Sequence, residues 1–263
     1  MATTLDFEKL PADQHVTAWI APTSDVTGIS NVAVPTAPEI NNTGGASGVI
    51  PASQTVSWND YDFGISESET SAEPSLADIS TYETFGMANY GGNVSFFAPR
   101  KYDDNSNLHS VIYDITDEPG ALVDIITRID GDTRTSEPAA DGDFVSVFRT
   151  KISGETNPFA PGESVRRTVP FTNDGDFAHY TIIGTHTITA VAPSSFAEGD
   201  KGRIRGIVQD RDYTNALDFT SSDADVVEVS NGGFYRVVGT GTATITLTDR
   251  EAGTSATVEV TVA

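Results

Sequence analysis

Strict alternation of apolar and polar residues in the last third of the chain most constrains its fold. Residues 242–247 place Ala243, Ile245 and Leu247 on one side of an extended backbone and three threonines on the other. Residues 257–262 repeat the pattern with three valines. A period of two residues sets one face of a strand against a core and the other in water. The pattern therefore predicts antiparallel strands of a small β-sandwich.

Further strand patterns precede these two and define a domain boundary. Gly, Asp and Asn turn signals separate the expected strands, at residues 185–192, 202–210 and 233–238. The spacing of these turns fits a sandwich of short strands. Since the regular pattern begins after Gly184, we predict two domains, residues 1–184 and residues 185–263.

The first domain has a less regular pattern that is still mostly strand-like. Strands are expected at residues 15–21, 93–98, 121–129, 144–152, 164–171 and 177–183. One helix is expected at residues 106–115, where Leu108, Ile112 and Ile115 follow helical spacing and Asn105 is the expected N-cap. Pro119 and Gly120 should end it. The predicted fold class is therefore all-β with one flanking helix.

Residues 36–74 break this pattern. They are rich in Gly, Ser, Asn, Pro and acids, and look strand-like only at residues 55–58. Long segments without steady periodicity are uncommon in compact domains and are usually functional loops or segments ordered by a partner. The sequence therefore predicts a long loop at residues 36–74.

The charge of the chain excludes several partners. Its 263 residues include 38 acidic and 15 basic ones, a formal charge of −23. Binding to nucleic acid or to an anionic membrane needs clustered Lys and Arg, so neither is expected. Residues 1–16 lack the basic start and apolar core of a signal peptide, and no apolar run is long enough to span a membrane. These features predict assembly in the cytoplasm without export by the usual route.

Metal and catalytic motifs have little support. Asp-Gly-Asp occurs three times and is interpreted as calcium ligands or, with more weight, as β-turns, at residues 130–132, 141–143 and 174–176. The chain has no cysteine, and no zinc spacing joins its histidines, which are His15, His109, His179 and His186. His179 and His186 are expected to be surface or strand residues. Carboxylate pairs at Asp210/Asp212 and Asp223/Asp225 lie in predicted turns, where no cleft is expected. No catalytic, cofactor or metal residue is therefore predicted, and the chain is not expected to be an enzyme.

Five residues are candidate contacts between subunits. Two basic pairs are too few for a nucleic-acid surface, but the guanidinium groups could bind carboxylates of a neighbouring copy. Ordinary exposed charge explains them equally well. A large aromatic of the first domain could pack in the core or at an interface. The candidates are Arg100, Lys101, Arg166, Arg167 and Trp58.

The second domain resembles the bacterial immunoglobulin-like (Ig-like) domain family, group 2. The likeness rests on residues 219–229 (FTSSDADVVEV), 239–245 (GTGTATI) and 258–262 (VEVTV). Phe219 stands where that family usually has Trp. The resemblance implies a β-sandwich and no particular reaction. Such domains occur on exported surface proteins and on phage virions, and without a signal peptide the second setting is favoured.

The first domain resembles the tube domain of major tail proteins of long-tailed actinobacterial phages, the siphoviruses. The likeness rests on residues 90–97 (YGGNVSFF), 149–153 (RTKIS), 162–171 (GESVRRTVPF) and 175–180 (GDFAHY). It implies a β-sandwich or half-barrel with one flanking helix, six copies of which form a ring. Rings would stack around the tape-measure protein, between terminator and tip proteins, and later conduct DNA without specific binding. Residues 36–74 would reach an adjacent subunit or ring, and the Ig-like domain would lie outside.

Other functions stay open at this point. The second domain could recognise carbohydrate on a host surface, whether or not the chain is part of a tail. The chain could instead be a capsid decoration protein. A polysaccharide hydrolase rests only on the abundance of carboxylates.

Overall fold

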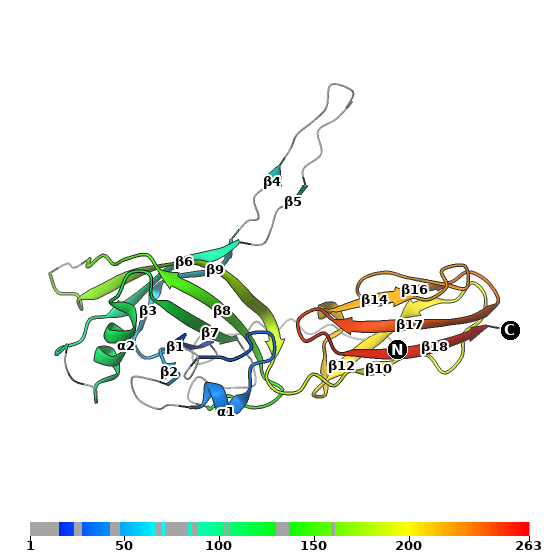
Figure 1. Ribbon diagram of the computed structural model, residues 1–263, viewed down its shortest axis with the longest axis horizontal. Helices are drawn as coiled ribbons and strands as arrows, with labels where there is room; N and C mark the ends of the chain where they lie inside the picture. Colours follow the sequence, from blue (N-terminus) through cyan, green and yellow to red (C-terminus); the bar gives the residue numbers. More distant parts are fainter. Residues whose placement is uncertain are drawn as a thin grey trace, which may run out of the picture. The chain divides into compact units, whose positions relative to one another are not determined.

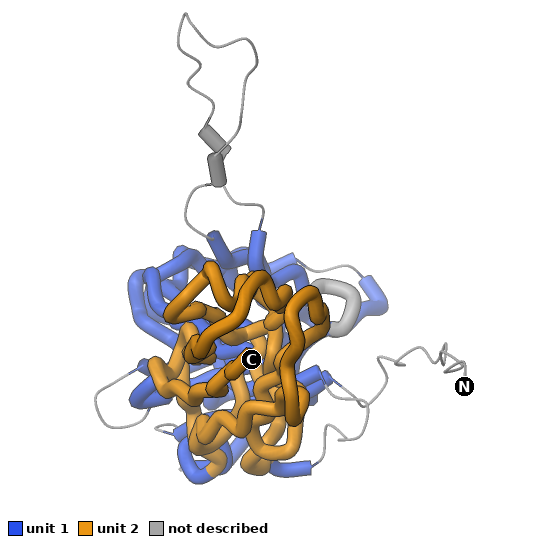
Figure 2. Tube along the Cα trace, turned by 90° about the vertical axis from the view of Figure 1, so that its right-hand side faces the viewer, with its two compact units in different colours: residues 1–32, 38–138, 146–179 blue, residues 33–37, 139–145, 180–263 orange. Residues whose placement is uncertain are grey.

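The computed structural model describes residues 16–23, 28–42, 48–66, 70–71, 84–85, 89–102, 104, 106–129, 137–158 and 161–262. The chain is mostly β structure, which confirms the predicted fold class. It forms two compact units (Figures 1 and 2). Unit 1 takes its described residues from 1–32, 38–138 and 146–179, and unit 2 from 33–37, 139–145 and 180–263. The boundary at residue 184 and the Ig-like assignment stay predictions.

Unit 1 contains a seven-stranded sheet that curls into a half-barrel (Figure 1). The strands in spatial order are β2 (Ile50–Pro51), β1 (Val16–Pro22), β7 (Leu122–Ile129), β8 (Phe144–Ile152), β9 (Arg166–Ile182), β6 (Asn89–Phe97) and β3 (Val56–Ser66). The pairs β1–β2, β1–β7, β3–β6 and β6–β9 are antiparallel. The sheet is open, with β2 at one edge and β3 at the other.

One face of this sheet packs against helix α2 (Leu108–Thr116). Val111, Ile112 and Ile115 of the helix join a cluster of buried strand residues. The predicted helix is confirmed, but its predicted N-cap is wrong. The side chain of Asn107 accepts a hydrogen bond of 2.9 Å from the backbone N–H of His109, and its backbone is extended as an N-cap requires. Asn105 lies outside the described residues.

The prediction of a long loop at residues 36–74 is wrong for much of its length. Helix α1 (Ala37–Ile40), β2, β3 and β4 (Thr70–Ser71) lie there, and β4 pairs with β5 (Thr84–Phe85). Tyr61 and Phe63 of β3 pack on the core cluster, while Asp62 between them is exposed. This period-two pattern is short and lies among turn-forming residues, which hides it in the sequence.

The two strands predicted at residues 164–171 and 177–183 form the single strand β9. The expected turn at residues 174–176 is wrong, because Gly175 takes a φ of +96° within the strand while the chain keeps its direction. The expected turn at residues 141–143 is confirmed. There Gly142 has a φ of +91°, and Asp143 N–H donates to the carbonyl of Ala140 over 3.1 Å.

Unit 2 holds three small antiparallel sheets around one core. Their orders are β10-β12-β13, β11-β16-β15 and β14-β17-β18. The elements are β10 (Thr189–Val191), β11 (Lys201–Arg203), β12 (Arg205–Val208), β13 (Arg211–Asp212), η2 (Thr214–Ala216), β14 (Leu217–Ser221), β15 (Val227–Val229), β16 (Phe234–Val237), β17 (Gly241–Asp249) and β18 (Ser255–Val262). Ala243, Ile245 and Leu247 are buried as their alternation predicts. The strand expected at residues 202–210 is divided into β11 and β12 at Ile204.

Candidate functional site

The most prominent feature of unit 1 is the long edge strand β3. It pairs with β6 on one side, with Asp62 opposite Asn93 and Ile65 opposite Tyr90. The sheet order ends at β3. An edge strand of eleven residues presents backbone N–H and C=O groups to any further strand that approaches. This edge is therefore a surface on which another β-strand can be added.

Two glycines of β6 let the neighbouring strands β3 and β9 each approach β6 closely beside that edge. Gly91 and Gly92 have φ angles of +152° and +134°. A Cβ on Gly92 would overlap the carbonyl oxygen of Asp62 in β3, and a Cβ on Gly91 would lie 2.8 Å from the carbonyl oxygen of Phe171 in β9. Only glycine has both the backbone freedom and the small size that these positions require.

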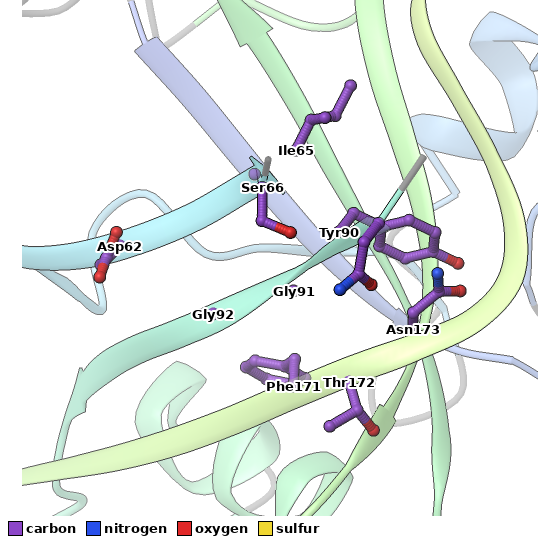
Figure 3. Close-up of a pocket in the computed structure, with 11 residues that line it drawn as sticks. Asp62, Ile65, Ser66, Tyr90, Gly91, Gly92, Phe171, Thr172 and Asn173 are labelled. Carbon is purple, nitrogen blue, oxygen red and sulfur yellow. The ribbon is translucent and has the colours of Figure 1, made fainter. Parts of the chain in front are cut away.

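Both glycines line an open depression of about 440 Å³ (Figure 3). Ile65 and Ser66 of β3 lie on one side of it, and Thr172 and Asn173 of β9 on the other. Ile65, in the edge strand itself, is 44% exposed. The depression and the edge strand β3 together form one continuous surface, which includes the apolar side chain of Ile65.

The sheet face opposite α2 is polar where β3, β6 and β9 run side by side. Asp62, Asn93 and Pro170 form one cross-strand row, and Ser95 and Thr168 another. The hydroxyls of Ser95 and Thr168 are 2.7 Å apart. Asp62 and Asn93 are exposed, and Pro170 and Thr168 are half-buried. These two rows hold small polar side chains and one carboxylate, with no cation.

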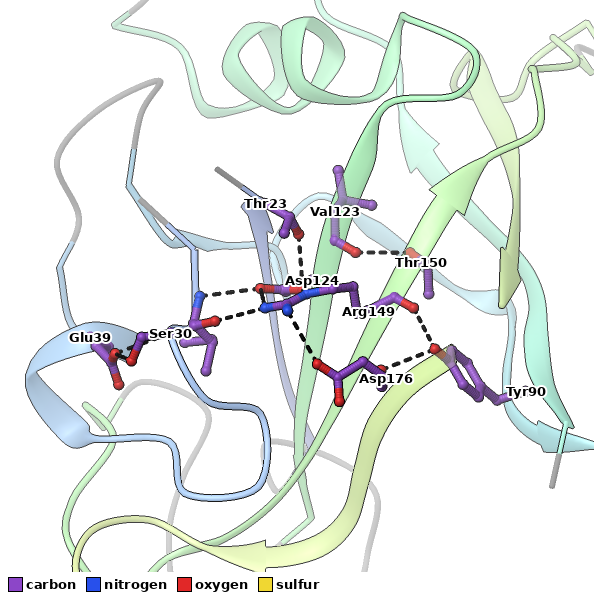
Figure 4. Close-up of polar contacts among 10 residues, drawn as sticks. Thr23, Ser30, Glu39, Tyr90, Val123, Asp124, Arg149, Thr150 and Asp176 are labelled. Atoms are coloured by element: carbon purple, nitrogen blue, oxygen red, sulfur yellow. Dashed lines mark hydrogen bonds and ion pairs between the residues drawn. The ribbon is translucent and has the colours of Figure 1, made fainter. Parts of the chain in front are cut away.

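A buried ion pair joins strands β7 and β8 of the same sheet (Figure 4). The Asp124 carboxylate of β7 has a fully buried side chain and accepts from Arg149 Nε of β8 over 3.0 Å. It also accepts from Thr23 Oγ1 over 2.9 Å and from Ile29 N–H over 3.1 Å. Arg149 Nη2 donates to the carbonyl of Ile29 over 2.7 Å. The hydrogen bond to Asp124 raises the pKa of Arg149, so the guanidinium keeps its proton.

The same network continues to β6 and β9. Tyr90 donates its hydroxyl to the carbonyl of Arg149, over 2.5 Å, or to that of Asp176, over 3.0 Å. Arg149 Nη1 reaches the Asp176 carboxylate at 3.1 Å. Burial raises the pKa of Tyr90, so its hydroxyl keeps its proton. The network holds the segment around Ile29 against the sheet; it has the character of a structural anchor.

The predicted contact residues Arg100 and Lys101 are exposed just after β6. Arg100 lines a cleft of about 590 Å³ together with Tyr102 and Val165. Tyr102 is 54% exposed and Val165 51% exposed. The structure therefore brings a cation and two exposed apolar side chains together at one cleft.

The remaining predicted contact residues lie in different settings. Arg166 is half-buried and donates to Glu163 over 2.6 Å. Arg167 is 2% exposed; it pairs with Glu155, donates to Thr116 and lies over a tyrosine ring. These contacts of Arg167 all lie within its own chain, and its predicted role at a subunit contact stays a prediction. Trp58 belongs to β3, but its side chain is outside the described part.

The histidines and acidic motifs do not form a metal site in the described part of the chain, where no three His, Cys, Asp or Glu residues gather. His179 is an exposed residue of β9, as predicted, and its Nδ1 lies 3.0 Å from the hydroxyl of Ser146. The prediction for His186 is wrong: it is buried against Asp249. His15 and residues 130–132 lie outside the described residues.

Comparison with known protein families gives the decisive observation. Residues 3–186 match the model of the family described as phage tail tube protein. The chain belongs to the phage tail tube protein family. A search of curated proteins found no match.

Membership in this family defines the coarse function. The protein is a structural component of the virion tail, it assembles with copies of itself, and it is not an enzyme. Among the described residues, no helix is long and apolar enough to cross a membrane. The match ends two residues beyond the predicted boundary, so it assigns no role to most of unit 2.

Proposed function

We propose that six copies of this chain form a ring, that rings stack into the siphovirus tail tube, and that the lumen conducts DNA. The observation that supports this best is the open sheet with β3 at its edge. An edge strand of this length needs a partner to avoid uncontrolled association. In a self-assembling family, another copy supplies that partner, and the curled sheets join into one barrel.

The polar face of β3, β6 and β9 supports a place at the lumen. Two of its rows contain Asp62, Asn93, Ser95 and Thr168, and no cation. Passing DNA binds to a surface mainly through Lys and Arg, which release its counterions. The two rows without a cation repel or ignore the phosphate backbone, and Arg166, in the next row of the same face, is paired with Glu163. DNA therefore passes without specific binding.

The exposed apolar residues support contacts between subunits. Ile65 lies in the edge strand β3, and Tyr102 and Val165 lie at the cleft that Arg100 lines. Aromatic side chains and Arg are enriched at interfaces. We include Lys101, Arg166 and Trp58 as further contacts. We also propose that residues 36–74, mainly through β3, contact a neighbouring copy.

The remaining parts of the proposal concern partners. The lumen encloses the tape-measure protein before DNA enters, and the ends of the tube meet terminator and tip proteins. Residues 185–263 fold as an Ig-like domain that is displayed outside the tube. Assembly takes place in the host cytoplasm.

Negative-stain electron microscopy of the purified protein tests the ring and the tube. We expect six-fold rings or stacked tubes. Ile65→Lys should prevent them, because an ammonium group buried at the joint is costly, whereas the matched change Val191→Lys, at a residue of unit 2 that is 40% exposed, should not. A monomer under all conditions, or tubes from the Ile65→Lys protein, would contradict the proposal.

A further inference from the structure

Unit 2 exposes an aromatic ring on the outer face of the sheet β11-β16-β15. Phe234 of β16 is 58% exposed, whereas Tyr235 next to it is 7% exposed and belongs to the core. Successive side chains of a strand point to opposite faces, so Phe234 and Arg236 share the outer face. The ring is held out in water and adds little to the core.

Cationic side chains surround this ring. Phe234 is opposite Arg203 of β11, and Arg236 is opposite Lys201 of β11 and Glu228 of β15. Directly opposite residues of an antiparallel pair point to the same face. The outer face therefore carries three cations and one carboxylate, on a chain whose formal charge is −23. We call these five residues the Phe234 face.

The guanidinium of Arg203 is fixed above the ring. Its Cζ lies 5.0 Å from the centroid of Phe234. Its Nε donates to the carbonyl of Gly232 over 2.7 Å, and its Nη2 to the side chain of Asn215 over 2.8 Å. Arg236 is held by two hydrogen bonds of 2.7 and 3.1 Å to Glu228. Because both arginine side chains are already ordered, they lose less conformational entropy when a ligand binds.

The outer face of the sheet β14-β17-β18 provides a contrast. The outward residues of β17 on the sheet β14-β17-β18 are threonines, among them Thr242, Thr244 and Thr246. Threonine is an ordinary choice for the wet side of a strand. The aromatic and cationic residues thus distinguish the Phe234 face from the outer face of the sheet β14-β17-β18.

We propose that the Phe234 face binds an anionic polysaccharide. The C–H face of one sugar ring packs on the phenyl ring, as apolar groups pack on exposed aromatics. Carboxylate or phosphate groups on the neighbouring sugars accept hydrogen bonds from Lys201, Arg203 and Arg236, whose charge complements theirs. The binding is weak for one copy and is multiplied when many copies are displayed together.

The chemistry favours a polysaccharide over a protein partner. A protein interface of standard size buries about 800 Å² on each side around an apolar centre. The Phe234 face offers a single apolar side chain among charged groups. One ring is enough for one sugar, and the charged groups reach along a chain of them. This inference concerns unit 2 alone and does not depend on the ring and tube.

Equilibrium binding of the full-length protein to defined polymers tests the inference. The probes are polygalacturonate, a carboxylated polysaccharide, neutral dextran, poly-L-glutamate and single-stranded DNA. We expect polygalacturonate to bind most tightly, with an affinity that falls as salt is added. Equal binding of poly-L-glutamate or DNA would overturn the inference, since the surface would then recognise charge alone. Failure of polygalacturonate to bind would also overturn it.

Matched variants distinguish the contribution of the Phe234 ring to binding from that of the charged side chains. Phe234→Ala should weaken the binding of polygalacturonate about three- to tenfold, and Phe234→Tyr should restore it. Arg236→Ala should weaken binding and its salt dependence, whereas Arg250→Ala, an exposed arginine paired with Asp218, should leave both unchanged. Thermal unfolding of each variant checks the fold. Unchanged binding by a folded Phe234→Ala protein would contradict the role of the ring.

Discussion

His186 and Asp249 are joined inside unit 2 by a hydrogen bond of 2.7 Å between Nδ1 and Oδ2, and both side chains are fully buried. The other ring nitrogen, Nε2, lies 2.7 Å from the carbonyl oxygen of Ile182. Both partners are acceptors, so the ring satisfies them only as an imidazolium with two protons. The pair is therefore ionic although it is out of contact with water.

The stability of unit 2 should depend on the proton of His186. Burial alone would lower the pKa of His186, but the hydrogen bonds to Asp249 and Ile182 outweigh it and raise that pKa above its ordinary value. A raised pKa means that the stabilisation is fully present below about pH 6.5, the ordinary value, and is lost as the pH rises through the folded-state value. Urea unfolding between pH 6 and 10 should show this loss, and His186→Gln should not show it. Parallel curves for the two proteins would contradict the expectation.

Replacing Asp249 should destabilise unit 2 more than deprotonating His186 does. Asp249 also accepts from the backbone N–H groups of Glu251 and Ala252, at 2.8 and 2.9 Å. Asp249→Ala leaves a buried imidazolium and two backbone N–H groups without their carboxylate, so the free energy of unfolding should fall by about 3 to 5 kcal/mol. Denaturant unfolding at pH 6 measures it. Asp218→Ala, at an exposed pair with Arg250, is the control and should cost at most about 1 kcal/mol.

Gly92→Ala should destabilise unit 1 through the backbone. The new Cβ would overlap the Asp62 carbonyl, at a φ of +134° that other residues rarely adopt. The cost should be about 2 kcal/mol or more. Gly64→Ala is a matched control on the neighbouring strand, because a Cβ there has no heavy atom within 4 Å. Equal unfolding midpoints for the two variants would show that the close approach of β3 and β6 is not needed.

Asp124→Asn should loosen the anchored segment around Ile29. The amide keeps the size of the side chain but removes the charge that Arg149 pairs with. Breaking a buried pair on one side should lower the free energy of unfolding by about 3 to 5 kcal/mol. Hydrogen exchange should rise at the Ile29 amide, which donates to Asp124. Glu163→Gln, at an exposed partner of Arg166, should leave both measurements nearly unchanged.

The sequence alone predicted the elements whose pattern is complete within a few residues. The bounds of β8 match residues 144–152, and β17 and β18 bury the alternate residues that were expected. Helix α2 follows its apolar spacing closely. Each of these signals is local, since the backbone alone dictates which side chains share a face.

The candidate sites were harder to predict because they depend on pairing between distant segments. Asp124 and Ile29 are 95 residues apart in the chain, and His186 and Asp249 are 63 apart. Nothing local marks either pair. Phe234 raises a different difficulty: both it and Tyr235 are aromatic, so a four-residue strand does not reveal which of them faces the core.

The arginines that are bound inside the chain affect how copies meet. Arg149 and Arg167 have their carboxylate partners in their own subunit, so those charges are already neutralised before any contact between copies. What remains between two copies at a distance is the mutual repulsion of two strongly acidic proteins. Dissolved ions screen such repulsion over about 8 Å at physiological ionic strength. Added salt should therefore speed the association of copies, so ionic strength controls when a tail begins to grow.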